Sequence, residues 1–494
     1  MSDSQLFASQ FVAALQKLGV KSFYLAPGAR SQALAIAVNQ LAKAGLVDLT
    51  VRLDERSMGF MALGRALGDN YPVALITTSG TAVANLHPAV LEAHHAGVPM
   101  ILLTADRPAK LRGKGANQTT NQNGIFADAV RDCIDVDASA DPRLVAKRAV
   151  ELAVGGEERP GPVQVNIQFA EPLSSSQPSA LEFVTKPEPV RRLNHLGELD
   201  VVVSSHAVVI AGAGAGRTAS DFAKAAKLPL LAEPSSGARV QDSVTNYISK
   251  LSELGTQIDQ VFVFGKPTLS RPVLNLLRNT EYWVQKPTNY ESFDVFDKAQ
   301  GLADRLVPIG QGSADWFASW ESEPEKSDRA TLVSKVWDAT SGDDRLLFGA
   351  SELIRVAERV VEGKDLNVFA SRGLAGIDGT VSTALGLAQE GNQVRAVMGD
   401  LTLLHDASGL NLSGLGDLNV QLVVGNDHGG AIFSHLEMAQ LLEKPDFDLL
   451  FTTPQAVNLE ALALSYGWHY LKTTPAELDQ HLNLKGFVLI DCLL

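Results

Sequence analysis

Gly399-Asp400-Leu401 and Asn426-Asp427-His428-Gly429-Gly430 each follow a short apolar run, and this pattern decides how the chain folds. The runs at 394–398 and 420–425 are rich in β-branched residues, which predicts two strands. Apolar residues at helical spacing between them, from Leu403 to Leu410, predict a connecting helix. In a parallel sheet both acidic strand ends emerge at the same edge, where α/β proteins place their ligands.

Two carboxylates at one sheet edge suit a hard divalent cation. Asp400 and Asp427 offer the oxygen ligands that such a cation takes. The Gly429-Gly430 turn and a nearby helix N-terminus could offer N–H groups to a phosphate. The alternative is that both aspartates only cap strand–helix turns, because Gly and Asp are ordinary turn residues.

Length and composition indicate a multidomain globular protein. The usual domain size divides 494 residues into roughly three domains, and 45% hydrophobic with 20% charged residues is typical of a well-buried fold. The net charge of −14 argues against nucleic acid and anionic membranes as partners. Cys133 and Cys492 lie far apart without metal-ligand spacing, which suits a reducing compartment. With no apolar run of ~18 residues and no signal pattern, we expect a cytoplasmic enzyme without membrane insertion.

Alternating strand and helix patterns divide the chain into three blocks. The first begins with an apolar helical face at 5–18 and a strand at 22–26, and it ends with a strand at 163–167. Polar stretches at 173–193 and 311–330 predict linkers. We therefore predict an α/β protein of three Rossmann-like domains with parallel central sheets, covering residues 1–180, 190–325 and 330–494.

The middle block contains one glycine-rich loop. Gly212, Gly214 and Gly216 follow a predicted strand at 207–211, which resembles the start of a dinucleotide-binding loop. The next fingerprint position is Arg217 instead of glycine, so a plain strand–turn–helix is the alternative.

The two opening motifs resemble the cofactor motif of thiamine-diphosphate-dependent enzymes, Gly-Asp-Gly followed by Asn-Asn. The resemblance implies that Asp400, Asp427 and the backbone carbonyl of Gly429 bind Mg²⁺ or Mn²⁺. Leu401 replaces a glycine and Asp427 replaces an amide, but the oxygen ligands remain. The implied thiamine-diphosphate contacts are Glu55, Ser79, Gly80, Thr81, Ile377, Gly399, Asp400, Leu401, Asp427, Gly429, Gly430 and Ile432.

Glu55 matches the catalytic glutamate of this family. In the family, that carboxyl group lies beside the aminopyrimidine ring of the cofactor and favours its imino tautomer, which removes the C2 proton of the thiazolium. The protein supplies placement and tautomer control, while the cofactor is the electron sink. The alternative for Glu55 is an exposed acid in the first turn of a helix.

Seven strings in the expected order resemble one branch of the family, the synthases of menaquinone biosynthesis. They lie at 26–31, 54–56, 78–85, 104–108, 115–118, 371–379 and 426–433. The resemblance covers all three blocks and implies the thiamine-diphosphate-binding fold. It also implies decarboxylation of 2-oxoglutarate and 1,4-addition of the resulting succinyl-semialdehyde carbanion to isochorismate.

Both of these substrates carry carboxylates, which arginine forks bind in bidentate fashion. The family's substrate positions fall on Arg30, Arg107, Gln118, Ser351, Arg355, Arg372 and Ile432, and a basic residue of its middle domain falls on Arg271. Three of these arginines follow predicted strand ends, where ligand sites form. Taken singly, each is as consistent with a surface ion pair, worth ~0–1 kcal/mol.

Some positions depart from the family pattern or are also consistent with a purely structural role. Ala29 stands where the family usually has Ser, which removes one hydrogen bond worth ~0.5–1.5 kcal/mol. Ile377 could equally be an ordinary core residue. We expect the adjacent His94 and His95 to pack or to form an interface. His405 and His428 lie beside the cofactor motif without an assigned role.

The family architecture implies that Glu55 of one subunit serves the metal site of another, which requires a homodimer or homotetramer. Two other functions remain open. One is a different thiamine-dependent decarboxylase or carboligase, similar to acetolactate synthase, with a smaller and less basic acceptor site. The other is a non-catalytic binding protein on the same fold, although Glu55 together with both metal carboxylates argues against it.

Overall fold

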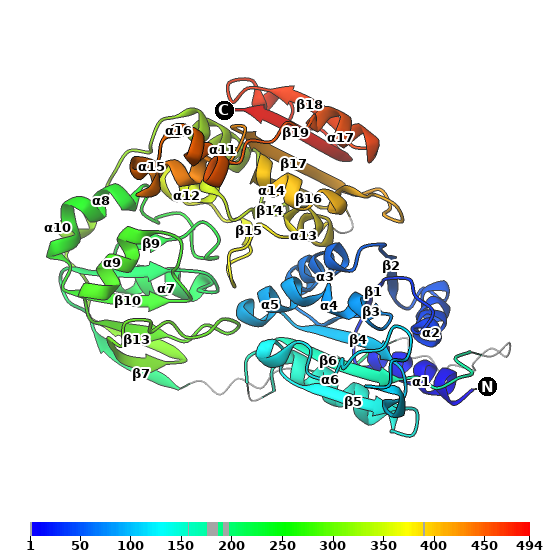
Figure 1. Cartoon of the computed structure of the whole chain (residues 1–494). Helices are drawn as coiled ribbons and strands as arrows, with labels where there is room; N and C mark the ends of the chain where they lie inside the picture. The colour runs from blue at the N-terminus through cyan, green and yellow to red at the C-terminus, as the bar shows by residue number, and fades with distance from the viewer. Residues whose placement is uncertain (1, 157, 175–185, 191–196, 389–390) are drawn as a thin grey trace. The chain divides into compact units, whose positions relative to one another are not determined.

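The computed structural model describes residues 2–156, 158–174, 186–190, 197–388 and 391–494. Most of the predicted linker at 173–193 lies outside these residues. The chain forms two compact units (Figure 1). The first contains Met1–Leu193 with the short segments Leu385–Leu387 and Asn411–Gly416, and the second contains the remainder. Among the described helices, none has both the length and the apolar character to cross a membrane.

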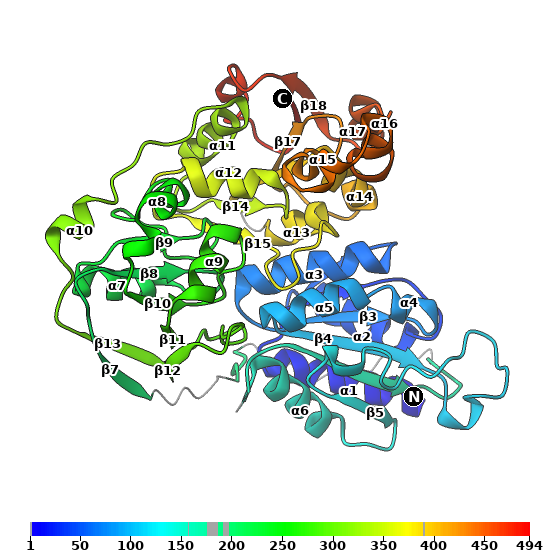
Figure 2. The same ribbon diagram turned by 60° about the vertical axis from the view of Figure 1, so that its left-hand side comes forward.

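A six-stranded parallel sheet forms the centre of the first unit, in the order β2-β1-β3-β4-β6-β5. The strands are β1 Ser22–Leu25, β2 Asp48–Val51, β3 Val73–Thr77, β4 Met100–Asp106, β5 Cys133–Asp137 and β6 Pro162–Gln168. One face is covered by α1 Asp3–Lys17, α2 Gln32–Lys43 and α6 Pro142–Val154, and the other by α3 Glu55–Asp69 and α5 His87–Ala96 (Figure 2). The short helix α4 Thr81–Ala84 precedes α5.

The predicted N-terminal helix shows why these residues fold in this way. Phe7, Phe11 and Leu15 lie on one face of α1 and are buried in the core of the first unit. The Ser2 side chain caps the helix by accepting a hydrogen bond from the Gln5 backbone N–H at 3.3 Å. Gly19, with a φ of 98°, follows the helix end as the sequence predicted.

The second unit contains a five-stranded parallel sheet and a parallel strand pair. The larger sheet has the order β12-β11-β10-β8-β9, and β13 pairs with β7. The strands are β7 Glu198–Val202, β8 Ala207–Ala211, β9 Leu230–Ala232, β10 Gln260–Phe264, β11 Tyr282–Gln285, β12 Ala299–Ala303 and β13 Arg305–Ile309. Its helices are α7 Arg217–Ala226, α8 Tyr247–Leu254, α9 Arg271–Asn279 and α10 Ala314–Ala318.

A second six-stranded parallel sheet also belongs to this unit, in the order β15-β14-β16-β17-β19-β18. Its strands are β14 Arg345–Phe348, β15 Asn367–Ala370, β16 Gln393–Gly399, β17 Asn419–Asn426, β18 His469–Thr473 and β19 Phe487–Leu493. The helices along this part of the chain are α11 Asp328–Ala339, α12 Glu352–Val360, α13 Thr380–Leu387, α14 Asp400–His405, α15 Met438–Leu441, α16 Lys444–Phe447 and α17 Leu459–Ser465. The predicted α/β fold with parallel sheets is confirmed, while the three domain boundaries stay a prediction.

The two strands that carry the acidic motifs are neighbours, as predicted. β16 and β17 pair in parallel, with Gly399 opposite Gly425, so Asp400 and Asn426 follow at the same sheet edge. The connecting helix differs from the prediction, because α14 ends at His405 and a 3₁₀ turn spans Ala407–Leu410. The break coincides with Asp406, a buried carboxylate that accepts a hydrogen bond from the Ser382 backbone N–H at 2.7 Å.

The expected linker at 311–330 is wrong for its first half. Residues 314–318 form α10, and Trp316 and Trp320 are buried in the core of the second unit. The indole N–H of Trp316 donates to the carbonyl of Ala207 at 2.9 Å. Because many of the surrounding residues are serines and acidic residues, composition did not indicate that these two tryptophans are buried.

The backbone N–H groups of the glycine-rich loop at 212–216 bond to other segments of the chain. The backbone N–H of Ala213 donates to Lys266 at 3.1 Å, and that of Gly216 donates to Ser236 at 2.9 Å. A Cβ at Gly212 would lie 2.1 Å from the nitrogen of Pro267. These N–H groups are therefore used within the fold, which agrees with the plain strand–turn–helix interpretation and not with a phosphate cradle.

Candidate active site

Nine of the residues predicted from sequence line one cavity of about 220 Å³ in the second unit. They are Ser351, Ile377, Gly399, Asp400, Leu401, Asp427, Gly429, Gly430 and Ile432. The ends of β16 and β17 carry the two aspartates, and Ser351 caps α12, its hydroxyl accepting from the Leu353 backbone N–H at 3.3 Å. The fold thus gathers residues from separate stretches of sequence.

Asp400 is the least satisfied charged group of this cavity. The residue is 5% exposed, and its Oδ1 atom has no hydrogen-bond partner in the described part of the chain. Burial and the neighbouring Asp427 carboxylate raise the pKa of Asp400 to about 6. A divalent cation between the two carboxylates would supply the missing partner and offset their repulsion. The donor set therefore fits a Mg²⁺ or Mn²⁺ ion.

Asp427 has a partner that the sequence did not reveal. Its Oδ2 atom accepts a hydrogen bond from the Arg329 guanidinium, in the first turn of α11, at 2.8 Å. This ion pair fixes the direction of the Asp427 carboxylate. Arg329 lies in the polar stretch whose composition predicts a linker, so nothing in its surroundings indicated a role.

The turn after Asp427 can be built only with glycine. Gly429 has a φ of 145°, and a Cβ there would lie 2.5 Å from the carbonyl oxygen of Thr452. Gly430 donates its N–H to the same oxygen at 2.7 Å. The predicted metal-binding carbonyl of Gly429 accepts from the Ala431 N–H at 3.0 Å, which leaves one lone pair for a cation.

Three predicted arginines of the second unit differ in their surroundings. Arg372 is 5% exposed, and Arg355 donates to the carbonyl of Ser351 at 2.9 Å. Burial lowers the pKa of Arg355, and the positive charge of Arg372 lowers it further. These two guanidinium groups are therefore near each other and partly desolvated, which favours an anion. Arg271 is instead an exposed residue at the start of α9.

In the first unit, Glu55 begins α3. The helix is capped by Asp54, whose side chain accepts from the Arg56 backbone N–H at 2.9 Å. The half-buried Glu55 carboxylate accepts only a long hydrogen bond, from the Asn85 side chain at 3.4 Å. Its carboxyl group is thus held at a helix start without a strong partner among the contacts seen in the described residues.

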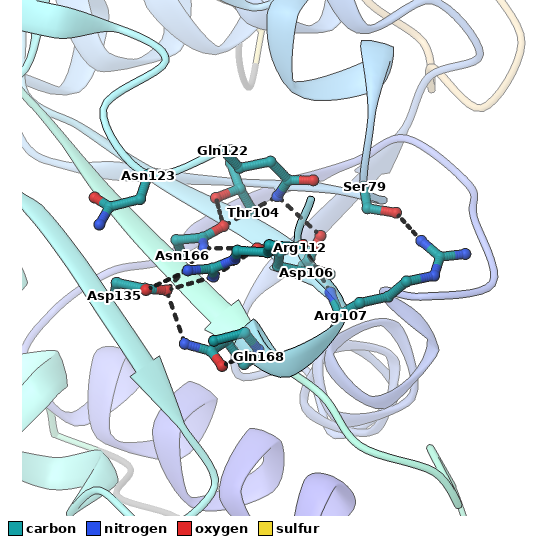
Figure 3. A network of polar contacts seen from close by, with 12 residues as sticks. Ser79, Thr104, Asp106, Arg107, Arg112, Gln122, Asn123, Asp135, Asn166 and Gln168 are labelled. Atoms are coloured by element: carbon teal, nitrogen blue, oxygen red, sulfur yellow. Dashed lines mark hydrogen bonds and ion pairs between the residues drawn. The ribbon is translucent and has the colours of Figure 1, made fainter. Parts of the chain in front are cut away.

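Other predicted residues of the first unit form a connected group. The Arg107 guanidinium donates to the Ser79 hydroxyl at 2.7 Å (Figure 3) and also to the Gln118 carbonyl at 2.6 Å. The Gln118 side chain donates back to the Ser79 carbonyl at 2.8 Å. Burial and the charge of Arg107 lower the pKa of Arg30, which donates to the Phe169 carbonyl at 3.1 Å. Gly80 precedes the exposed Thr81, the first residue of α4.

A buried polar network supports this group, and we did not predict it. Arg112 donates to Asp106 at 2.7 and 3.0 Å and to Asp135 at 2.8 and 2.9 Å (Figure 3). Asp106 also accepts from the Arg107 backbone N–H at 2.7 Å. Asn166 of β6 donates to both aspartates. The network therefore fixes the backbone from which Arg107 extends.

The network also reaches the loop that carries Gly80. The Gln122 side chain accepts from the Gly80 backbone N–H at 2.9 Å and donates to Asn166 at 3.0 Å. The sequence did contain a signal for this network. Gln164 and Asn166 alternate within the strand predicted at 163–167, and Gln168 follows directly at the same spacing, so the three share one face.

Hydrogen bonds compensate the buried charges of the network. The hydrogen bonds from Arg112 to Asp135 and Asp106 raise the pKa of Arg112 against the effect of burial. For Asp135, burial alone would raise the pKa, but hydrogen bonds from Arg112, Asn166 and Gln168 outweigh it and lower the pKa. The Arg112 guanidinium and the Asp135 carboxylate thus remain ionised together.

The four histidines noted in the sequence lie in different surroundings. The His94 ring contacts the Arg131 and Arg159 guanidinium groups, each at 3.3 Å, and the His95 ring edge-on. This is consistent with the packing role that we expected. His405 lies 3.8 Å from Asp378, and the His428 backbone N–H donates to the Asn426 side chain at 3.1 Å.

Comparison with known proteins gives two findings. A family model described as the N-terminal, cofactor-binding domain of thiamine pyrophosphate enzymes matches residues 6–125. A protein of Leifsonia xyli subsp. xyli named 2-succinyl-5-enolpyruvyl-6-hydroxy-3-cyclohexene-1-carboxylate synthase is 40% identical, over 97% of this chain and 94% of that protein.

Two further relatives carry the same name. The protein of Paenarthrobacter aurescens is 38% identical over 97% of this chain and 92% of its own length. That of Mycolicibacterium smegmatis is 35% identical over 95% of this chain and 92% of its own length. The similarity therefore spans both units and nearly the whole of each relative.

Proposed function

The chain belongs to the family of 2-succinyl-5-enolpyruvyl-6-hydroxy-3-cyclohexene-1-carboxylate synthases, and we propose that its substrates are 2-oxoglutarate and isochorismate. It is a thiamine-diphosphate-dependent transferase of menaquinone biosynthesis. In the proposed reaction 2-oxoglutarate loses CO₂, and the remaining succinyl-semialdehyde unit adds to the ring alkene of isochorismate in a 1,4 manner.

The observation that carries this proposal is the cavity around Asp400. Residues predicted from separate motifs line it together, and the unpartnered Oδ1 of Asp400 lies where a cation would complete the site. Asp400, Asp427 and the Gly429 carbonyl would hold Mg²⁺ or Mn²⁺, which would bind the cofactor's diphosphate. Thiamine diphosphate, when bound, supplies the electron sink for the loss of CO₂.

The chain's own residues would then hold a proton beside the cofactor and bind the carboxylates of the substrates. Glu55 would hold a proton at the aminopyrimidine ring, because the hydrogen bond that its carboxylate accepts from Asn85 within the described residues is long, at 3.4 Å, and easily given up. Arg355 and Arg372 in the second unit, and Arg30 and Arg107 in the first, would bind substrate carboxylates. Gln118, Ser351, Ile432 and the exposed Arg271 complete the proposed substrate contacts.

We propose further that the enzyme is a homodimer or homotetramer in the cytoplasm, with active sites shared between subunits. A complementation experiment tests the sharing. Glu55→Gln and Asp400→Ala chains, each inactive alone, should regain partial activity when they are mixed and refolded. Mixed dimers that form but stay inactive would count against shared sites.

The reaction itself is tested with purified protein, thiamine diphosphate, Mg²⁺ and 2-oxoglutarate, with and without isochorismate. We expect CO₂ release and loss of the isochorismate absorbance to occur together. Both should require thiamine diphosphate and Mg²⁺. Consumption of pyruvate with 2-oxoglutarate untouched would favour an enzyme similar to acetolactate synthase. Cofactor binding without any turnover would favour a non-catalytic protein.

A further inference from the structure

Arg372 is held by a segment that the sequence did not single out. It lies in the loop after β15, and its NH2 group donates to the Thr268 hydroxyl at 2.8 Å. The Nε atom of Arg372 is buried and has no hydrogen-bond partner within the described residues. One corner of the guanidinium is therefore fixed, while its Nε–H remains unused.

Thr268 belongs to the loop between β10 and α9, and this loop is tied to its surroundings next to Thr268. The backbone of Lys266 exchanges two hydrogen bonds with Ala213, at 2.8 and 3.1 Å. The Lys266 ammonium donates to the carbonyl of Gly373 at 3.3 Å, directly after Arg372 in the chain. The glycine-rich loop at 212–216 thus supports the segment that holds Arg372.

Glu233 is the second element of this support. It follows β9, is 2% exposed, and its Oε1 atom accepts from the Leu269 backbone N–H at 2.8 Å. Its Oε2 atom is buried with no hydrogen-bond partner in the part of the chain that the structure describes. Burial raises the pKa of Glu233, and the positive charge of Arg372 acts against this rise, so the two charges are close enough to interact.

A contact that served only stability would satisfy the buried polar atoms that it uses, because an unpaired buried donor or acceptor loses its hydrogen bonds to water without replacing them. Here Glu233 Oε2 and Arg372 Nε are both left over in the described structure. Arg355 is also close, since its pKa, lowered first by burial, is lowered further by the charge of Arg372. The buried Arg372 guanidinium with its unused Nε–H and the partly desolvated Arg355 guanidinium are suited to an incoming carboxylate.

We propose that Thr268 and Glu233 are positioning residues that hold the Arg372 guanidinium ready for a substrate carboxylate. Thr268 sets its orientation through one hydrogen bond, and Glu233 holds the Thr268-Leu269 segment and balances the charge. This inference rests on the proposed function, because it takes Arg372 as a carboxylate-binding residue. Supporting residues of this kind matter because small displacements of a binding group weaken binding.

The test compares Thr268→Val, which keeps the shape but removes the hydroxyl acceptor, with Thr268→Ser, which keeps the hydroxyl. We expect Thr268→Val to raise KM for one of the two substrates roughly 10-fold, with kcat changed less than about 3-fold. Thr268→Ser should stay within about 3-fold of wild type in both constants. Thr331→Val is the matched control, because it removes a hydroxyl whose hydrogen bond lies at the start of α11.

Two further variants sharpen the result. Glu233→Gln keeps an acceptor for Leu269 but removes the charge, and should raise the same KM by roughly 3-fold. In an Arg372→Gln background, Thr268→Val should not raise KM further, because the guanidinium that Thr268 orients is already absent. A cooperative unfolding transition in each variant shows that the variants remain folded.

Several results would overturn the inference. They are an unchanged KM in folded Thr268→Val, a loss confined to kcat, or a Thr268→Ser variant as impaired as the valine variant. Wild-type protein that does not turn over the two substrates would overturn the proposed function and this inference with it. Active wild type with an unaffected Thr268→Val would overturn the inference alone.

Discussion

The polar network of the first unit and the acidic cavity of the second unit both bury carboxylates, but they treat them in opposite ways. Asp106 and Asp135 share the Arg112 guanidinium through four hydrogen bonds. Asp400 has a buried oxygen without a partner in the described residues and a pKa raised to about 6. The first arrangement is complete within the chain. In the second, Arg329 pairs with Asp427, and the buried oxygen of Asp400 has no counter-charge beside it among the described residues.

The difference indicates that the network of the first unit has a structural role, whereas the cavity of the second unit is suited to binding a ligand. A buried network whose members are paired rigidifies the backbone around it, here the segment that carries Arg107. Buried carboxylates that repel each other cost stability and persist where something else compensates them. The comparison therefore predicts opposite consequences when a charge is removed from each region.

The largest effect is expected for Asp400→Asn. Without one of the two carboxylates the proposed metal site fails, so activity should fall roughly 10⁴-fold or more, or about 5 kcal/mol. The metal-free variant should be as stable as wild type or more stable, because a poorly compensated buried charge is gone. Mg²⁺ should raise the unfolding midpoint of wild type but not of the variant.

The control for this experiment is Asp417→Asn, at an exposed aspartate of the same unit. It should leave both activity and the Mg²⁺ effect unchanged. A metal-free Asp400→Asn protein that is clearly less stable than wild type would contradict the comparison, because it would make Asp400 a structural residue.

In the first unit, Arg112→Met should destabilise the fold strongly. The substitution leaves the buried carboxylate of Asp106 and the half-buried carboxylate of Asp135 without their counter-charge, which costs about 3–5 kcal/mol. The measurement is the free energy of urea-induced unfolding. Arg148→Met, which removes an exposed ion pair with Asp132, should cost less than about 1 kcal/mol. If both variants lost the same free energy of unfolding, the network would contribute no more to stability than a surface ion pair.

A smaller effect is expected at Glu233, which is buried and only partly compensated. Burial raises its pKa to about 7 from the ordinary 4.5. Its contribution to stability is therefore fully present below pH 4.5 and is lost as the pH rises through 7. Glu233→Gln should remove this pH-dependent loss. Between pH 5 and 8 its free energy of unfolding should exceed that of wild type by up to about 3 kcal/mol.

The measurement is urea-induced unfolding of both proteins across that pH range. Glu362→Gln, at an exposed glutamate, is the control and should follow wild type at each pH. A constant difference between Glu233→Gln and wild type would mean that Glu233 does not titrate in this range.

Much of the architecture and of the cavity could be predicted from local patterns. Hydrophobic runs placed β16 and β17, and the acidic residues after them mark the sheet edge where they lie. Family motifs then pointed to residues that line one cavity. The end of α14 and the helix α10 were missed, because the side chains that decide them, Asp406 and Trp316, act through distant partners.

The sequence by itself determined the α/β fold, the two acidic residues at the sheet edge and the family. These follow from spacing along the chain, since strand periodicity and strand-end residues are local properties. Only the tertiary structure decided which charges are compensated. Arg112 differs from Arg372, and Asp106 from Asp400, through partners that lie elsewhere in the chain. Burial and hydrogen bonding are set by the folded environment, and no local pattern of residues encodes them.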